Sequence, residues 1–334
     1  MATNEAHHAS TSTLSVSRLI CGTFSKWLFG SVAAVACLGC GQSADQSVKN
    51  GFLLGFDDGG IAVIALDSGS KVYLRVREKG HYWRKPVWHK ELSRFICIDD
   101  YNSIWAVPCS GSAKLLYSAP KDCEVSQVTV MPRGQIVFLL ENNSHNLPKS
   151  VMVLDSKSLQ STLVAKANID SGSFLQPIGD TKLVVACLQR PNESQEWQHL
   201  VSIVDINGKT PIREVLTLDR AAKYAASADG NQLFIAGPGD KFQLYDLASS
   251  GLHEIKPKEL PGKAAEGMPV LFDGGNAVVV FRERDVTLPL GCFSVDLQNM
   301  RVTRVSSALI SAPTFLTEFP SGCGSVDVKT KTEN

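Results

Sequence analysis

A pair of short strands joined by a turn recurs along the chain, and the first strand of each pair is apolar. An aspartate begins the turn in five copies, and a degenerate sixth copy has Cys109 in its place: the aspartates are Asp67, Asp155, Asp205, Asp246 and Asp296. The steps between successive copies are 42, 46, 50, 41 and 50 residues. This regular period indicates a repeat architecture, in which each unit buries its apolar faces against its neighbours.

A second hairpin precedes most of these pairs, so that each repeat holds four strands. Its turns are rich in Gly, Asn and Asp, which tolerate the positive φ of tight hairpins; they follow Val130, Ile178, Ala228 and Phe272. No helical periodicity is found past residue 50. Four strands in a period of about 40–50 residues predict the blades of an all-β, six-bladed β-propeller. A seven-bladed ring is the alternative.

The two ends of the repeat region complement each other. Phe52-Leu-Leu-Gly-Phe56 has the pattern of a second strand with no first strand before it, whereas 311–322 has the pattern of a lone innermost strand. We therefore predict that the C-terminal strand completes the first blade, which closes the ring and removes the exposed edges of an open array. The propeller is predicted to span 51–320, with a polar tail at 321–334.

One hairpin carries a recognisable motif. Ser227-Ala-Asp-Gly-Asn-Gln-Leu233 resembles the S-x-D-G-x-x-apolar element of the TolB-type and WD40-like β-propeller repeat superfamily. The resemblance covers residues 51 to about 320. It implies the fold and says little about function, because propellers host enzymes, scaffolds and sensors alike.

The N-terminal region has the features of an export signal. Arg18 and Lys26 precede an apolar stretch at 27–39, which is shorter than the roughly 20 residues that span a bilayer. Leu38-Gly-Cys40-Gly resembles the lipobox of bacterial lipoproteins. We predict a signal peptide or leader at 1–39, a lipidated Cys40, a tether at 40–50 and membrane contact through the lipid only. Cleavage after Ala36, which would give a soluble periplasmic or secreted protein, and an uncleaved anchor are the alternatives.

The cysteines past the leader are even in number and have no metal-binding spacing. Past the leader no C-x-x-C occurs, and the chain has no His-x-x-x-His, so neither a metal nor a cofactor is expected. Cys97 and Cys187 lie in apolar strands and are predicted to be buried free thiols. Cys109 with Cys123, or Cys292 with Cys323, are candidate disulfides in an oxidising compartment, although the sequence does not fix the connectivity.

The lengths of the connections distinguish the two faces of the predicted propeller. Turns between strands one and two, and between three and four, are short. The other connections, which lie on the opposite face, hold the insertions: 78–86, 141–149, 190–199, 256–267 and 282–290. Long loops on one rim of a rigid scaffold usually carry the binding role.

The first insertion has the most distinctive composition. His81, Tyr82, Trp83 and Arg84 interleave aromatic and basic side chains, which can stack on sugars or anchor a protein partner. The alternative is that Trp88 packs between blades and that the cations belong to a solvated loop.

Two further insertions supply weaker candidates. Trp197 and His199 form a second candidate binding site, and Arg282 with Glu283 begins a charged run at a strand end. A hydrolase or metal site would fit that run, but a solvated charge cluster is the favoured interpretation, because alternating charges on loops usually serve solubility.

The net charge and the absence of catalytic motifs argue against several classes of function. The 33 Lys and Arg residues balance 33 Asp and Glu residues, which argues against a nucleic-acid binder. No G-x-S-x-G, H-E-x-x-H or Walker motif is present, so a non-catalytic role is favoured and enzymatic activity stays undecided. We predict an exported, lipid-anchored propeller that binds an envelope protein or another ligand as a scaffold. The alternatives are an envelope hydrolase or lyase with carboxylates at the channel mouth, and a glycan-binding propeller with exposed Trp83 and Trp197.

Overall fold

The computed structural model describes residues 51–142, 149–167, 171–189, 198–207, 212–218, 222–227, 229–236, 241–256, 265–273, 275–283, 289–308 and 310–326. The chain divides into two units, Met1–Gln42 and Ser43–Asn334. The predicted leader, the tether and Cys40 lie outside the described residues, as do residues 327–334.

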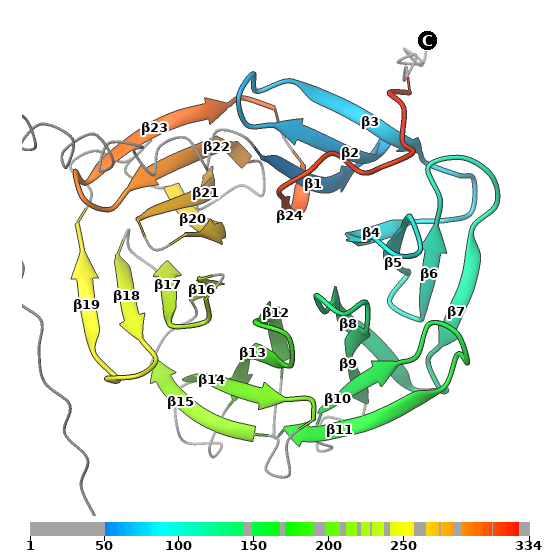
Figure 1. The fold of residues 1–334 in the computed structure, drawn as a ribbon, viewed down its shortest axis with the longest axis horizontal. Helices are drawn as coiled ribbons and strands as arrows, with labels where there is room; N and C mark the ends of the chain where they lie inside the picture. Colours follow the sequence, from blue (N-terminus) through cyan, green and yellow to red (C-terminus); the bar gives the residue numbers. More distant parts are fainter. Residues whose placement is uncertain are drawn as a thin grey trace, which may run out of the picture. The chain divides into compact units, whose positions relative to one another are not determined.

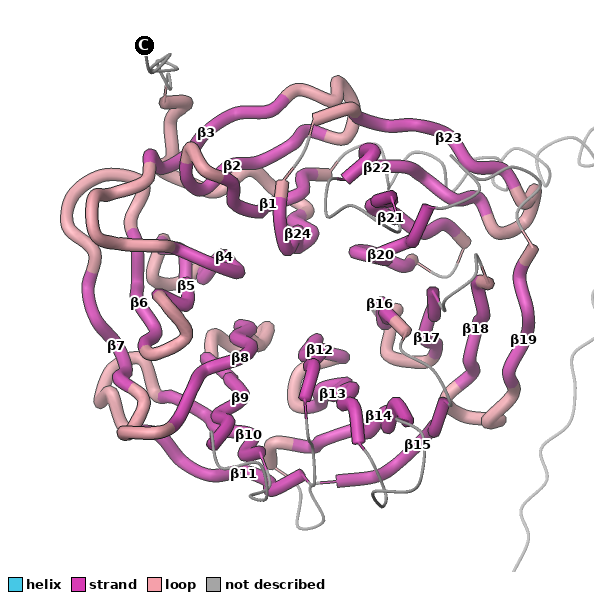
Figure 2. The backbone as a smooth tube through the Cα atoms, turned by 180° about the vertical axis from the view of Figure 1, so that it is seen from behind, coloured by secondary structure: helices cyan, strands magenta, loops and turns pink. Residues whose placement is uncertain are grey.

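The described part of the second unit forms six antiparallel sheets, or blades, of four strands each around a central axis (Figure 1, Figure 2). From the inner to the outer strand, blade 1 contains β24 (Ser311–Leu316), β1 (Phe52–Asp57), β2 (Gly60–Ala65) and β3 (Lys71–Val76). Blade 2 contains β4 (Trp83–His89), β5 (Arg94–Asp99), β6 (Ser103–Val107) and β7 (Lys114–Ser118). Blade 3 contains β8 (Cys123–Val130), β9 (Ile136–Asn142), β10 (Lys149–Leu154) and β11 (Ser161–Ala167).

Blade 4 contains β12 (Ser171–Ile178), β13 (Lys182–Gln189), β14 (Gln198–Asp205) and β15 (Ile212–Leu218). Blade 5 contains β16 (Lys223–Ala226), β17 (Gln232–Ala236), β18 (Phe242–Asp246) and β19 (Leu252–Ile255). Blade 6 contains β20 (Ala265–Phe272), β21 (Asn276–Glu283), β22 (Pro289–Asp296) and β23 (Arg301–Ser306). The six-bladed prediction is confirmed, and the seven-bladed alternative is wrong.

The C-terminal strand closes the ring, as predicted. β24 is the innermost strand of blade 1 and pairs antiparallel with β1, with Phe52 opposite Leu316. The register shifts at Gly55, where a Cβ would lie only 2.7 Å from the carbonyl oxygen of Ser311. Glycine is therefore required at this bulge, because any side chain would push the closing strand away.

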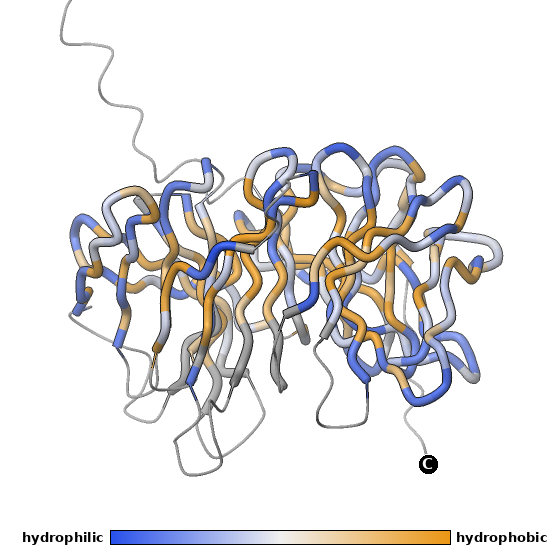
Figure 3. The backbone as a smooth tube through the Cα atoms, turned by 90° about the horizontal axis from the view of Figure 1, so that it is seen from below, coloured by the Kyte–Doolittle hydropathy of each residue, from blue (hydrophilic) through white to orange (hydrophobic). Residues whose placement is uncertain are grey.

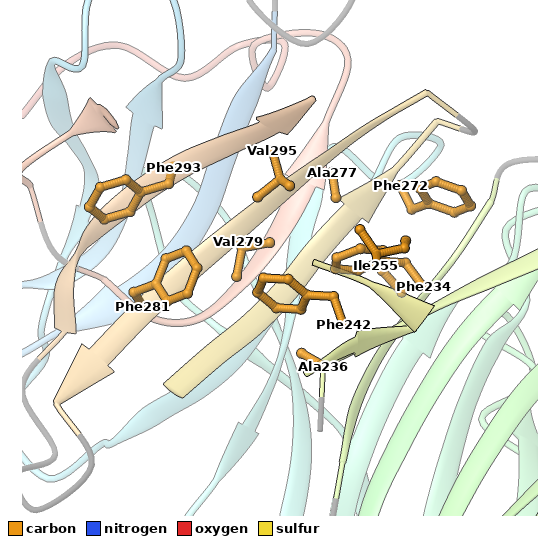
Figure 4. Packing of buried hydrophobic residues seen from close by; sticks show 11 residues of the cluster. Phe234, Ala236, Phe242, Ile255, Phe272, Ala277, Val279, Phe281, Phe293 and Val295 are labelled. Atoms are coloured by element: carbon orange, nitrogen blue, oxygen red, sulfur yellow. The ribbon is translucent and has the colours of Figure 1, made fainter. Parts of the chain in front are cut away.

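The hydrophobic core lies between the blades. The second strand of each blade is buried on both faces, so successive residues belong to different clusters. In β17, Phe234 and Ala236 pack against blade 6, whereas Leu233 and Ile235 pack against blade 4. This explains why these strands are continuous apolar runs in the sequence. Figure 4 shows the cluster between blades 5 and 6, and Figure 3 shows apolar residues along the strands and polar residues in the turns.

The recurring aspartate caps the turn between the third and fourth strands. Oδ1 of Asp155 accepts hydrogen bonds from the backbone N–H groups of Lys157, at 2.9 Å, and Ser158, at 2.6 Å. Asp246 and Asp296 make the equivalent bonds in blades 5 and 6. Hydrogen bonds within the turn lower the pKa of all three carboxyls; the backbone bonds contribute most for Asp155 and Asp246, and the side-chain amide of Asn299 contributes most for Asp296. The repeat is thus a local turn motif, which the sequence shows directly.

A C-terminal strap, residues 317–326, crosses from blade 1 to blade 2. The ring of Phe319 lies 5.5 Å from that of Phe52, and Val326 pairs with Tyr73 on the outer strand of blade 1. A disulfide joins Cys323 to Cys109 in the β6–β7 turn, across 214 residues of sequence.

Both candidate disulfides from the sequence are wrong, because Cys123 and Cys292 are free and Cys109 pairs with Cys323. The strap brings the C-terminal cysteine to blade 2, a long-range placement that spacing does not indicate. Cys97 is a buried free thiol, as predicted, and burial raises its pKa. The side chain of Cys187 lies outside the described residues.

Deleting residues 311–334 should destabilise every blade together, because the deletion opens blade 1 and removes the disulfide. We expect the melting temperature to fall by at least about 10 °C in a single transition, measured by calorimetry. Deletion of 327–334 alone keeps β24 and Cys323 and is the control. Equal melting temperatures for the long deletion and the full chain would contradict ring closure by β24.

The turn aspartates should make the stability depend on pH. Their folded pKa values lie below the ordinary 3.8, so their stabilisation is complete above that pH and is lost as the pH falls through the folded values. Asn keeps the turn acceptor but does not titrate. The variant D155N/D246N/D296N should therefore be less stable than the wild type near pH 6 by urea unfolding, and this deficit should shrink below about pH 3. A deficit that is constant with pH would be inconsistent with this role.

Candidate functional site

The connections between second and third strands, and between successive blades, form one face of the propeller, which we call the loop face. The first predicted insertion on this face is shorter in the structure than in the sequence-based prediction. Residues 83–86 of the predicted insertion 78–86 belong to the inner strand β4, so this connection is only 77–82. The two longest connections, 190–197 between β13 and β14 and 256–264 between β19 and β20, fall almost wholly outside the described residues.

The first candidate stretch lies where blades 1 and 2 meet. His81 and Tyr82 end the β3–β4 connection, and Trp83 and Arg84 are the first residues of β4. The structure therefore places these four candidates together on the loop face.

The other candidates are not brought to this place. His199 belongs to β14 in blade 4, and Arg282 and Glu283 end β21 in blade 6. The side chains of these three residues, and the whole of Trp197, lie outside the described residues.

Trp83 is a core residue, which corrects the expectation of an exposed ring. Its exposed fraction is only 4%, and it packs in the cluster between blades 1 and 2. The ring of Trp83 stacks on that of His81 at 4.5 Å and contacts Trp105 edge-on at 5.7 Å. A large ring on the inner strand gains more from burial there than from exposure at the rim. Trp88 also packs against this cluster, as the alternative interpretation predicted.

Asp99 holds the β3–β4 connection in place. One carboxylate oxygen of this residue, at the end of β5, lies 2.7 Å from Nδ1 of His81. The other accepts a hydrogen bond from the backbone N–H of Tyr82, also at 2.7 Å. Both oxygens are therefore used to fix the backbone next to the candidate residues, and their geometry is set before any ligand binds.

The partly exposed side chains at this place form a layered arrangement, which we call the arginine–tyrosine stack: Arg77, Tyr82, Arg84 and Tyr101. The guanidinium groups of Arg77 and Arg84 each lie 4.6 Å from the ring centroid of Tyr82. Arg84 also lies 4.3 Å from the ring centroid of Tyr101. Cation–π contacts of this kind hold guanidinium groups in position without pairing their charge.

Unusual backbone conformations set the positions of two members of the stack. The register of β4 shifts between Arg84 and Val87, and Lys85 within this bulge has a φ of 49°. Tyr101, in the β5–β6 turn, has a φ of 61°, although this left-handed region normally favours glycine. Such conformations store strain and often occur at functional sites. Here they aim Arg84 and Tyr101 at each other.

One donor of the stack, and one on the residue next to it, have no acceptor among the described residues. Within the described ranges, no ion pair links Arg77 or Arg84 to a carboxylate. The Nε atom of Arg84 is buried without a hydrogen-bond partner, as is Nε1 of Trp83 beside it. Buried donors without an acceptor are rare and need an explanation.

The nearest strand-end carboxylate of blade 1 is engaged elsewhere. Asp57 accepts hydrogen bonds from Lys71, from the hydroxyl of Tyr73 at 2.7 Å and from the backbone N–H of Gly59 at 2.7 Å. Burial by itself would raise the pKa of Asp57, but these bonds outweigh it and hold the pKa below its ordinary value. Asp57 is thus an ionised structural residue.

The described ranges lack the residue groups and the helices that mark metal sites and membrane spans. They contain no group of three or more His, Cys, Asp or Glu that is able to hold a metal ion. No helix in them combines the length and the apolar character needed to cross a membrane.

Sequence reasoning found Tyr82 and Arg84 but missed Arg77 and Tyr101. Arg77 lies just before the predicted insertion, and Tyr101 lies in a short turn of the next blade. The signal that indicates Tyr101 is its position in a tight hairpin turn, Asp100-Tyr101-Asn102, where a large ring is unexpected.

No family model matches this chain, and no curated protein matches it. Among solved structures, a protein of unknown function from Bacteroides caccae has a TM-score of 0.54 at 15% identity, covering 80% of this chain and 100% of that one. TolB from Acinetobacter baumannii has a TM-score of 0.52 at 10% identity, covering 80% and 67%. An oligogalacturonate lyase from Vibrio parahaemolyticus has a TM-score of 0.52 at 8% identity, covering 78% and 82%.

These likenesses show the fold alone. The chain is a six-bladed β-propeller similar to those of TolB and oligogalacturonate lyase, and the resemblance to TolB-type propellers is confirmed at this level. Function does not follow from it, because one propeller architecture hosts many activities.

Proposed function

We propose that this chain is an exported, lipid-anchored interaction module of the bacterial cell envelope, which binds a protein partner on its loop face at blades 1 and 2. The arginine–tyrosine stack carries this proposal. It combines partly exposed aromatic rings with guanidinium groups that lack ion pairs within the described residues. Tyr and Arg dominate the residues that contribute most to protein–protein binding.

Preorganisation supports a binding role. Asp99 fixes the connection that carries Tyr82, and the β4 bulge fixes Arg84. Side chains that are already ordered lose little conformational entropy when a partner binds, so more of the contact energy becomes affinity.

Two features support export. The leader at 1–39 has the composition of a secretory signal, with Cys40 in a lipobox-like setting. The Cys109–Cys323 disulfide fits an oxidising compartment outside the cytosol.

The alternatives receive less support at this site. The ring of Trp83, on which a glycan would have to stack, is buried in the core. A hydrolase or lyase needs carboxylates that are free to act, but Asp57 and Asp99 are both held by structural hydrogen bonds.

Substitution of Tyr82 by Ala should remove the partner, because it deletes the ring that both arginines contact. We expect the amount of partner captured from solubilised envelopes by the tagged full-length protein to fall about tenfold or more. Phe319→Ala, an equally large truncation in the C-terminal strap on the opposite face, is the matched control. Circular dichroism verifies that both variants fold. Equal capture by wild type and Tyr82→Ala would refute the proposed interface.

Substitution of Cys40 by Ser should abolish lipidation. In a bacterial host the wild type should incorporate labelled palmitate and sediment with membranes, whereas Cys40→Ser should do neither. Cys37→Ser is the control, since it leaves the acceptor cysteine intact. Labelling of Cys40→Ser at the wild-type level would contradict the anchor, and an unprocessed wild-type chain in the cytosol would contradict export.

A further inference from the structure

We propose that the arginine–tyrosine stack is an anion site that recognises carboxylate groups in an acidic peptide segment of a protein partner. This inference rests on the proposed function and names the chemistry of its contact. The stack gathers two cations without neutralising them, and it holds them in fixed positions at the rim.

The charge of the stack is uncompensated within the described part of the chain. Arg77 and Arg84 contact the same tyrosine ring at equal distances of 4.6 Å, so two like charges are held close together. The ion pairs of this neighbourhood join other groups, namely Lys71 to Asp57 and Arg75 to Glu78, and Asp99 contacts His81. Two like charges on one ring repel each other, and an anion bound beside them offsets the repulsion.

The geometry leaves the guanidinium edges available for hydrogen bonds. Rings stack on the flat face of a guanidinium, whereas its N–H donors lie in the plane. Arg84 lies over two tyrosine rings, and because its Nε is buried, a carboxylate would approach the outer edge of the guanidinium, which carries the two Nη atoms. Stacked in this way, the group keeps the planar fork that binds a carboxylate through two parallel hydrogen bonds.

Several observations favour an acidic peptide over other anions. The chain has no net charge, so no broad positive field favours a polyanion such as nucleic acid. The tyrosine rings beside the cations offer apolar contact to the peptide chain between its carboxylates. Inorganic phosphate shares the oxyanion chemistry and is therefore included as a competitor.

The test measures the binding of fluorescein-labelled hexaglutamate to the full-length protein by fluorescence anisotropy. We expect Arg84→Gln and Arg77→Gln each to weaken the affinity about tenfold, and labelled hexalysine not to bind. Arg84→Lys keeps the charge but loses the planar fork, so it should also bind several-fold more weakly than wild type. Arg133→Gln is the control, because Arg133 lies in the β8–β9 turn on the opposite face, where its side chain pairs with Asp180.

The following results would contradict the proposal. Hexaglutamate that binds wild type, Arg84→Gln and Arg133→Gln equally, or that does not bind wild type, overturns the anion site. Displacement by inorganic phosphate at concentrations far below the peptide dissociation constant overturns the peptide assignment. Thermal melts of each variant show whether a loss of binding is a loss of folding, and Arg84→Lys serves as the folded substitute where Arg84→Gln does not fold.

Capture of the envelope partner by two variants distinguishes failure of the anion site from failure of the proposed interface. Loss of the envelope partner in Tyr82→Ala, together with full capture by the double variant R77Q/R84Q, removes the anion site and leaves the interface standing. Full capture by Tyr82→Ala removes the interface itself.

Discussion

Two-sided burial of the second strand in each blade is the constraint on which the rest of the structure depends. A strand such as β17 sends alternate side chains to two different neighbours, so no blade completes its core alone. The stability of every blade is then tied to the presence of the next, and an unclosed ring would leave two apolar faces and two strand edges exposed. β24 meets this need by supplying the inner strand of blade 1 from the far end of the chain.

Closure also determines where the candidate site can lie. Blade 1 is assembled from both ends of the repeat region, so its boundary with blade 2 is the one that the C-terminal strap crosses and that the Cys109–Cys323 disulfide joins. Arg77 follows the outer strand of blade 1, whereas Arg84 and Tyr101 belong to blade 2. The arginine–tyrosine stack therefore depends on the relative position of blades 1 and 2. The strap fixes this position on the opposite face, and the shared core around Trp83 fixes it in the interior.

The sequence predicts the fold far better than the site, and the reason is physical. The repeat period, the Asp turns and the missing first strand are properties of short segments, because the Asp side chains accept hydrogen bonds from backbone N–H groups one to three residues further along the chain. The burial of Trp83, the partner of Cys109 and the contact of Arg77 with Tyr82 depend on which strands the ring brings together. Residue type alone marks Trp83 as an attractive binding residue, although its place on the inner strand makes it core.

The stack also shows a conflict between local preference and tertiary structure that is informative about function. A hairpin turn with positive φ is most stable with Gly or Asn, yet this one holds Tyr101 at a φ of 61°. The β4 bulge similarly places Lys85 at a φ of 49° and leaves Nε of Arg84 buried without an acceptor. Other turns also hold non-glycine residues at positive φ, among them Ser93, Asp122 and Leu159, but here two such residues adjoin Arg84, whose buried Nε has no partner. Departures of this kind are expected where a surface is shaped for a ligand, because the missing counter-charges are then supplied by the ligand.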